Sequence, residues 1–91
     1  MSITIRIPAP LRSLTGNNQT VEGSGSDVCQ CIDHLESRHP GLKARICDDS
    51  GELRRFINMY VNGEDIRFLS GLQTPVKDGD ELSIVPAVAG G

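Results

Sequence analysis

The sequence predicts an α+β fold of the β-grasp type, in which a mixed sheet of four or five strands wraps one main helix. Two observations support this prediction. Apolar and polar residues alternate with the period of a strand at both ends of the chain and again after its middle. Between the N-terminal strands and the strand after the middle of the chain, one long segment has the 3.6-residue period of a helix. The resulting order is strand, strand, helix, strand, short strand, strand.

The first strand is predicted at residues 3–7, where three isoleucines alternate with a threonine and an arginine. Pro8 and Pro10 end this strand. A second, short strand is predicted at Gln19–Glu22, after the turn signal Gly16-Asn17-Asn18. A connection this short favours antiparallel pairing of the two strands.

The main helix follows a flexible joint at residues 23–26, and Ser26 or Asp27 is expected to cap it. The helical period places one set of side chains on a buried face: Val28, Ile32, Leu35 and His39, with Cys31 at its edge. The face expected to point toward water carries Asp33, His34 and Arg38. Pro40-Gly41 ends the helix, and a shorter helical turn is expected to return Leu42 and Ile46 to the core.

The second half of the chain predicts a hairpin and a final strand. The hairpin begins with a strand at Phe56–Val61 and turns at Asn62-Gly63, after which a returning strand is expected to carry Ile66 and Phe68. The final strand is predicted at Glu81–Val85, with Leu82 and Ile84 on one face and Ser83 and Val85 on the other. Because the helix lies on the crossover between the two hairpins, the first and final strands should be parallel neighbours.

The domain is expected to span residues 1–85, and residues 86–91 are expected to form a flexible C-terminal tail. If extended, this tail would reach roughly 20 Å beyond the domain. Glycine lacks a Cβ, so Gly90 and Gly91 can enter a slot too narrow for other residues and leave the terminal carbonyl open to attack. The alternative interpretation is an inert, frayed end.

Composition excludes several classes of function. A chain of 91 residues forms one small domain, and its net charge of −3 predicts no broad nucleic-acid-binding surface. It has no apolar stretch long enough to cross a membrane, and its N-terminus has the pattern of a strand rather than a signal peptide. We therefore expect a cytoplasmic protein, and three cysteines suit a reducing compartment.

The cysteines predict no metal site. Cys29 and Cys31 lie two residues apart on a helix and point to different faces, and three thiols are too few for an iron–sulfur cluster. We expect Cys31 in the core and Cys29 on the surface. Cys47 follows Lys43 and Arg45, which could lower the pKa of its thiol, but no partner base is evident and we expect an inert thiol.

Other sequence patterns point to no catalytic site. Neither a Ser/His/Asp or Cys/His motif nor a phosphate-binding glycine loop is recognisable. The loosely clustered basic residues are expected to form a solvated face: Arg38, Lys43, Arg45, Arg54 and Arg55.

Two outward-facing residues predict a docking surface beside the tail. If alternate residues of the Phe56–Val61 strand face the helix, Tyr60 faces outward, and so does Val85 on the final strand. Together they would form a small apolar patch flanked by Arg6, and a patch of this kind suits a partner protein.

Four segments carry a family resemblance: Leu11-Arg12, the run from Phe56 to Phe68, Asp78-Gly79-Asp80 and the run from Ile84 to Gly91. Through them the chain resembles the ThiS/MoaD family of ubiquitin-like sulfur carriers, and the resemblance covers essentially all 91 residues. Within the family, the chain most resembles the carriers of thiocarboxylate-dependent cysteine biosynthesis. The family pattern offers no role for Cys29 and Cys31.

The resemblance implies that this chain is no enzyme and binds no cofactor. A ubiquitin-activating-type enzyme would consume ATP to adenylate Gly91, and a sulfur donor would convert the adenylate into a thiocarboxylate. Gly90, which has no side chain, would fit the narrow part of the partner's channel, and Val88 and Ala89 would contact the walls of that channel.

The resemblance leaves the sulfur acceptor open. In the cysteine branch, a pyridoxal-phosphate-dependent cysteine synthase acts as the sulfur acceptor enzyme and loads the tail with an aminoacrylate-derived unit, and a metalloprotease then frees cysteine from the carrier. In the molybdopterin branch, the carrier is the small subunit of molybdopterin synthase. Two further alternatives are a protein modifier that forms isopeptide bonds through Gly91 and an interaction module with an inert tail.

Overall fold

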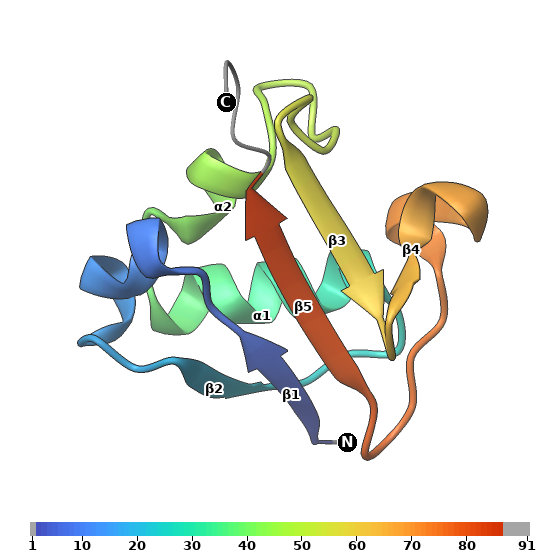
Figure 1. Cartoon of the computed structure of the whole chain (residues 1–91), viewed down its shortest axis with the longest axis horizontal. Coiled ribbons are helices and arrows are strands. Elements are labelled where there is room, and N and C mark those ends of the chain that lie inside the picture. The colour runs from blue at the N-terminus through green and yellow to red at the C-terminus, as the bar shows by residue number, and fades with distance from the viewer. Residues whose placement is uncertain (1, 87–91) are drawn as a thin grey trace.

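The computed structural model describes residues 2–86 and shows one mixed sheet with helix α1 (Val28–Arg38) packed across one face (Figure 1). The strands are β1 (Ile3–Arg6), β2 (Thr20–Gly23), β3 (Ile57–Val61), β4 (Glu64–Asp65) and β5 (Glu81–Pro86). A second helix, α2 (Leu42–Ile46), follows α1, and 3-10 helices lie at Ala9–Thr15, Ile66–Phe68 and Gly71–Gln73. The predicted β-grasp fold is confirmed.

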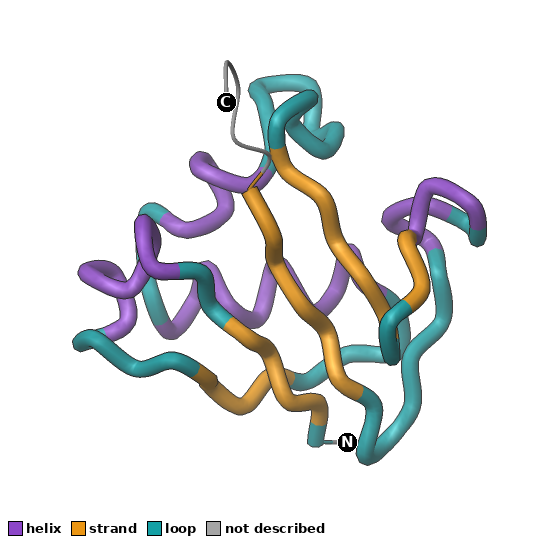
Figure 2. The backbone as a smooth tube through the Cα atoms, viewed as in Figure 1, coloured by secondary structure: helices purple, strands orange, loops and turns teal. Residues whose placement is uncertain are grey.

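The strand order β2-β1-β5-β3-β4 puts the final strand at the centre of the sheet, as Figure 2 shows in orange. β1 runs antiparallel to β2 and parallel to β5, with Ile5 opposite Leu82. On its other edge β5 runs antiparallel to β3, with Val61 opposite Leu82. Both predicted pairings of the first strand are therefore confirmed, and β5 is held on both sides.

The core lies between α1 and the sheet. Alternate residues of the central strands point into it, and Ile5, Met59 and Leu82 are at most 1% exposed. From the helix, Val28, Ile32 and Leu35 are buried as predicted, and Cys31, expected in the core at the edge of this face, is fully buried. The N-cap is Asp27, whose side chain accepts a hydrogen bond from the Gln30 amide at 2.8 Å.

The returning strand of the second hairpin is shorter than predicted. Only Glu64–Asp65 pairs with β3, and Ile66–Phe68 forms a 3-10 helix instead of a strand. The Asp65 carboxylate accepts a hydrogen bond from the Arg67 amide at 2.9 Å and so caps this helix. As a result Ile66 is buried, whereas Phe68 is 87% exposed and takes no part in the sheet.

Three further sequence interpretations are corrected. Gly23, assigned to a flexible joint, is the buried last residue of β2, where a side chain would collide with Ile5. His34, expected to point toward water, is half-buried, and its Nδ1 has no hydrogen-bond partner among residues 2–86. The segment Ala9–Thr15, read only as the end of a strand, is a 3-10 helix that buries Leu11 and Thr15.

A buried carboxylate ties the β3–β4 turn to the start of β5. Asn62 has φ +52° in this turn, a conformation that asparagine tolerates. Its side-chain amide donates to Asp80 Oδ1 at 3.0 Å, and the Lys77 amide donates to Asp80 Oδ2 at 2.9 Å. These hydrogen bonds, that of Asn62 most of all, lower the pKa of Asp80, which is 8% exposed.

We expect Asp80 to make folding stability depend on acid pH. Because the pKa of Asp80 is lower in the folded than in the unfolded protein, its contribution is complete above the unfolded value of about 3.9. The contribution is lost as the pH falls through the folded value. Urea unfolding of the native chain and D80N at neutral and acid pH should show D80N less stable near pH 7. The difference in unfolding free energy between the two proteins should shrink below about pH 4. A difference that does not change with pH would show that the Asp80 carboxylate is not the cause.

None of the helices within residues 2–86 has the length and apolar character needed to cross a membrane.

Candidate functional site

The candidate site lies at the C-terminal end of β5. Pro86 is the last residue of this strand and lies opposite Ile57 of β3. Four of the predicted site residues, Val88, Ala89, Gly90 and Gly91, lie outside the described residues. The structure therefore defines where their segment begins, at the end of the central strand.

Tyr60 and Val85 share the outer face of the sheet, on the side opposite α1. Tyr60 is opposite Ser83 and Val85 is opposite Asn58, so the two side chains are diagonal neighbours on adjacent strands. Val85 is 42% exposed and Tyr60 is half-buried. The structure thus brings together the predicted apolar patch next to the end of β5.

Polar side chains flank this patch on two sides. On β1, Arg6 forms an ion pair with Glu81 at 3.3 Å between Nε and Oε2. On the other side, the Arg67 guanidinium donates to the Asn58 side chain and to the Ile57 carbonyl, the latter at 2.8 Å. An apolar centre with a polar rim is the usual composition of a transient protein interface.

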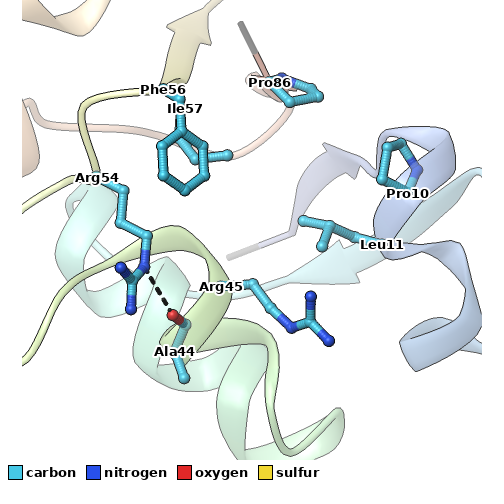
Figure 3. A pocket seen from close by; sticks show the side chains of 8 residues that line it. All are labelled: Pro10, Leu11, Ala44, Arg45, Arg54, Phe56, Ile57 and Pro86. Atoms are coloured by element: carbon cyan, nitrogen blue, oxygen red, sulfur yellow. Dashed lines mark hydrogen bonds between the residues drawn. The ribbon is translucent and has the colours of Figure 1, made fainter. Parts of the chain in front are cut away.

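A hollow of about 270 Å³ lies beside the end of β5 and was not predicted from the sequence (Figure 3). Its wall is mainly apolar and includes Leu11, Phe56 and Pro86, and Phe56 is 49% exposed. Arg45 of α2 and Arg54 of the following loop contribute guanidinium groups. The segments meet here only through the tertiary fold, so their spacing in the sequence gives no signal of the site.

A hydrogen-bonded corner fixes α2, which forms one side of the hollow. The Glu36 carboxylate accepts from the Lys43 amide at 2.8 Å and from the Gly41 amide at 3.1 Å. These bonds, with that of Lys43 the larger, lower the pKa of Glu36. The Lys43 ammonium group also forms an ion pair with Asp33 of α1 at 2.6 Å. One positive charge of the predicted solvated basic face is therefore neutralised.

Two of the three cysteines, Cys31 and Cys47, are buried. Cys31 is fully buried, and burial, assisted by Asp27, raises the pKa of its thiol to about 11. Burial also raises the pKa of Cys47 and outweighs the opposite effect of Lys43, so the expectation of an inert thiol is supported. Cys29 is exposed, as predicted. Among residues 2–86, no three His, Cys, Asp or Glu side chains are grouped so that they could hold a metal ion.

The fold and the exposed end of β5 define a ubiquitin-like β-grasp protein. The crystal structure of the Amycolatopsis orientalis BexX/CysO complex contains a similar chain, with a TM-score of 0.92 and 54% sequence identity. The match covers 98% of this chain and 99% of that one. The model of the ThiS family matches residues 5–91, and the chain belongs to this family of ubiquitin-like sulfur carriers.

Curated relatives extend over the same length. The sulfur carrier protein CysO of Mycobacterium tuberculosis is 46% identical over 93 residues, and the match covers 100% of both chains. Small archaeal modifier protein 3 of Haloferax volcanii is 32% identical, again over 100% of both chains. The molybdopterin synthase sulfur carrier subunit of Mycobacterium tuberculosis is 32% identical over 68 residues, which is 75% of this chain and 68% of that protein.

Proposed function

We propose that this chain is the sulfur carrier of a cysteine biosynthesis pathway, loaded with sulfur as a thiocarboxylate on Gly91. The observation that carries this proposal is the full-length similarity to CysO, which is 46% identical over 100% of both chains. The geometry agrees with it, because β5 leads from the centre of the sheet directly to the segment that would carry the sulfur.

The chemistry explains why a partner enzyme is needed. A carboxylate resists nucleophilic attack because its negative charge is delocalised over two oxygens. In the proposed reaction, a Gly91 carboxylate oxygen attacks the α-phosphorus of ATP, which releases pyrophosphate and forms an acyl-adenylate. Hydrosulfide then attacks the activated carbonyl carbon, the new C–S bond replaces the C–O bond to the phosphate, and AMP leaves. The product is a C-terminal thiocarboxylate, and the chain acts as a group carrier rather than as a catalyst.

The described residues supply the support and the docking surface. β5 is paired with β1 over Glu81–Ser83 and with β3 as far as Pro86, so β3 holds the end of β5 against the rest of the domain. Tyr60 and Val85 would contact the partner beside the entry to its active site. Val88 and Ala89 would then lie in the partner's channel, and Gly90 would pass its narrowest point because glycine has no side chain. ATP would be bound by the activating enzyme, and we propose no cofactor for this chain.

Two kinds of partner follow from this proposal. The first is a ubiquitin-activating-type enzyme that adenylates Gly91 and directs sulfur to it. The second is a sulfur acceptor, for which we propose a pyridoxal-phosphate-dependent cysteine synthase. The cysteine branch is favoured because CysO matches over the whole chain, whereas the molybdopterin synthase subunit matches 75% of it at 32% identity. We place these reactions in the cytoplasm, where ATP is available.

Intact-protein mass spectrometry tests the proposal. Chain isolated from its native cells, or incubated with ATP, sulfide and an activating enzyme from the same genome, should gain about 16 Da as sulfur replaces oxygen. The loaded chain should then transfer its sulfur to an O-activated serine in the presence of the cysteine synthase. Omitting ATP is the control and should leave the mass unchanged.

The same measurement separates the other candidates. A protein modifier would produce a ladder of larger conjugates linked through lysine side chains. This candidate is tested because small archaeal modifier protein 3 is similar over the full length of the chain. Transfer to a molybdopterin precursor rather than to a serine derivative would place the chain in the molybdopterin branch. An unchanged mass under every condition would leave only an interaction module.

A further inference from the structure

The hollow beside the end of β5 has the chemistry of a site for a short apolar peptide that ends in an anion. Its apolar wall includes Leu11, Ile57 and Phe56, and nearly half of the Phe56 surface is exposed. The guanidinium groups of Arg45 and Arg54 lie on the same side of the hollow (Figure 3). Guanidinium groups bind carboxylates through paired hydrogen bonds.

Both arginines have donors available for such an anion. Arg54 donates through Nε to the Ala44 carbonyl at 2.9 Å, a bond that holds its guanidinium group against α2 at the edge of the hollow. Among residues 2–86, neither terminal nitrogen of Arg54 nor any nitrogen of the Arg45 side chain donates a further hydrogen bond or joins an ion pair. A chain with net charge −3 thus keeps two cationic side chains beside an apolar hollow with no direct ion pair among these residues, although Arg54 is close enough to Asp48 to help lower the pKa of that carboxyl group.

The chain itself carries a segment of matching chemistry. Pro86 forms part of the hollow, and the residues that follow it are Ala87-Val88-Ala89-Gly90-Gly91. Five extended residues span at most roughly 17 Å, enough to cross the hollow and reach either guanidinium group. Val88 would supply an apolar side chain for Phe56, and the C-terminal carboxylate would supply the anion.

We infer that residues 87–91 dock reversibly in this hollow, with Val88 against Phe56 and the Gly91 carboxylate paired with Arg45 and Arg54. The inference rests on the proposed function in one respect, that Gly91 bears a free carboxylate or thiocarboxylate. Both groups carry one negative charge, so the loaded carrier docks in the same way. A partner that captures Gly91 competes with the docked state.

The free energy of the contact is small, so the docked and undocked states are both populated. Solvent-exposed ion pairs shift an equilibrium by only about twofold to fivefold, and the hollow is open on one side. Removing the contact should therefore raise the rate at which an activating enzyme captures Gly91 at low enzyme concentration by a similar factor.

Solution NMR of the complete chain alone tests the inference. We expect cross-relaxation between the Val88 methyl groups and the Phe56 ring, together with restrained amide dynamics at Gly90 and Gly91. Both signals should be lost in R45Q/R54Q and reduced in about 0.5 M salt. The matched control is R38Q/R55Q, which removes the same charge from two exposed arginines outside the hollow and should behave as the native chain.

Several outcomes would overturn the inference. One is the absence of any Val88–Phe56 signal in the native chain, and another is an equal loss of signal in both double variants. If Gly90 and Gly91 are unrestrained but R45Q/R54Q alone impairs sulfur loading, the hollow binds the partner enzyme instead. Because Arg54 also bonds to Ala44, R45Q alone gives a second test that leaves this bond intact. The NMR measurements need neither ATP nor partner, so their result is independent of whether sulfur loading occurs.

Discussion

Adding one alanine after Gly91 is expected to reduce thiocarboxylate formation on the order of 100-fold or more. The extra residue moves the carboxylate by about 3.5 Å along the chain. It also places a side chain where the proposed channel admits only glycine. Displacements of this size remove the alignment between the carboxylate oxygen and the α-phosphorus of ATP. Loading is measured by the mass gain of the intact chain in the presence of ATP and an activating enzyme.

The control for this variant is the same alanine added ahead of Ser2, at the opposite end of the chain. Loading of that variant should equal that of the native chain. Thermal unfolding of the chain extended after Gly91 should equal that of the native chain, since the added residue lies beyond the β5 strand, which ends at Pro86. If the chain extended after Gly91 accepted sulfur without being trimmed, the requirement for an open terminal glycine would be wrong.

The β-grasp fold could be predicted because its main elements have strong periodic signals. The isoleucines of β1 and the alternation in β3 and β5 each place one face in the core, and the burial of Ile5, Met59 and Leu82 confirms it. The parallel pairing of β1 with β5 follows from the position of the helix between two hairpins. Periodicity and connectivity were sufficient for these features.

The errors occurred where a local hydrogen bond or a tertiary contact outweighs periodicity. Ile66 and Phe68 alternate as in a strand, but the Asp65 side chain caps a 3-10 helix and turns Phe68 into solvent. In the same way, the helical wheel placed His34 toward water, whereas neighbouring structure buries its Nδ1. A wheel describes one helix and contains no information about what lies beside it.

The candidate site could be predicted only in part. Strand alternation predicted that Tyr60 and Val85 face outward. The antiparallel pairing of β3 with β5 then puts both side chains on the same face of the sheet. Arg45 and Arg54 were expected only as part of a solvated basic face. Their position beside Phe56 depends on the path of the chain after α2, for which the sequence has no periodic signal.

Replacing Leu82 by alanine is expected to have the largest effect on stability. Leu82 is 1% exposed and lies at the centre of the sheet, opposite Ile5 on one side and Val61 on the other. Truncation of such a side chain costs about 2–5 kcal/mol, because burial is lost and a cavity remains. That is a large part of the roughly 5–15 kcal/mol by which a domain is stable. Urea unfolding measures the change.

The matched control is S83A on the same strand. Ser83 faces the outer side of the sheet, where its side chain makes no hydrogen bond with any of residues 2–86, so the variant should stay within about 0.5 kcal/mol of the native chain. Equal destabilisation by both variants would contradict the proposed orientation of β5. A large loss in L82A alone would show that the strand leading to Gly91 is anchored through its buried face. The carrier's reactive end would then depend on the core for its position, although the core takes no part in the chemistry.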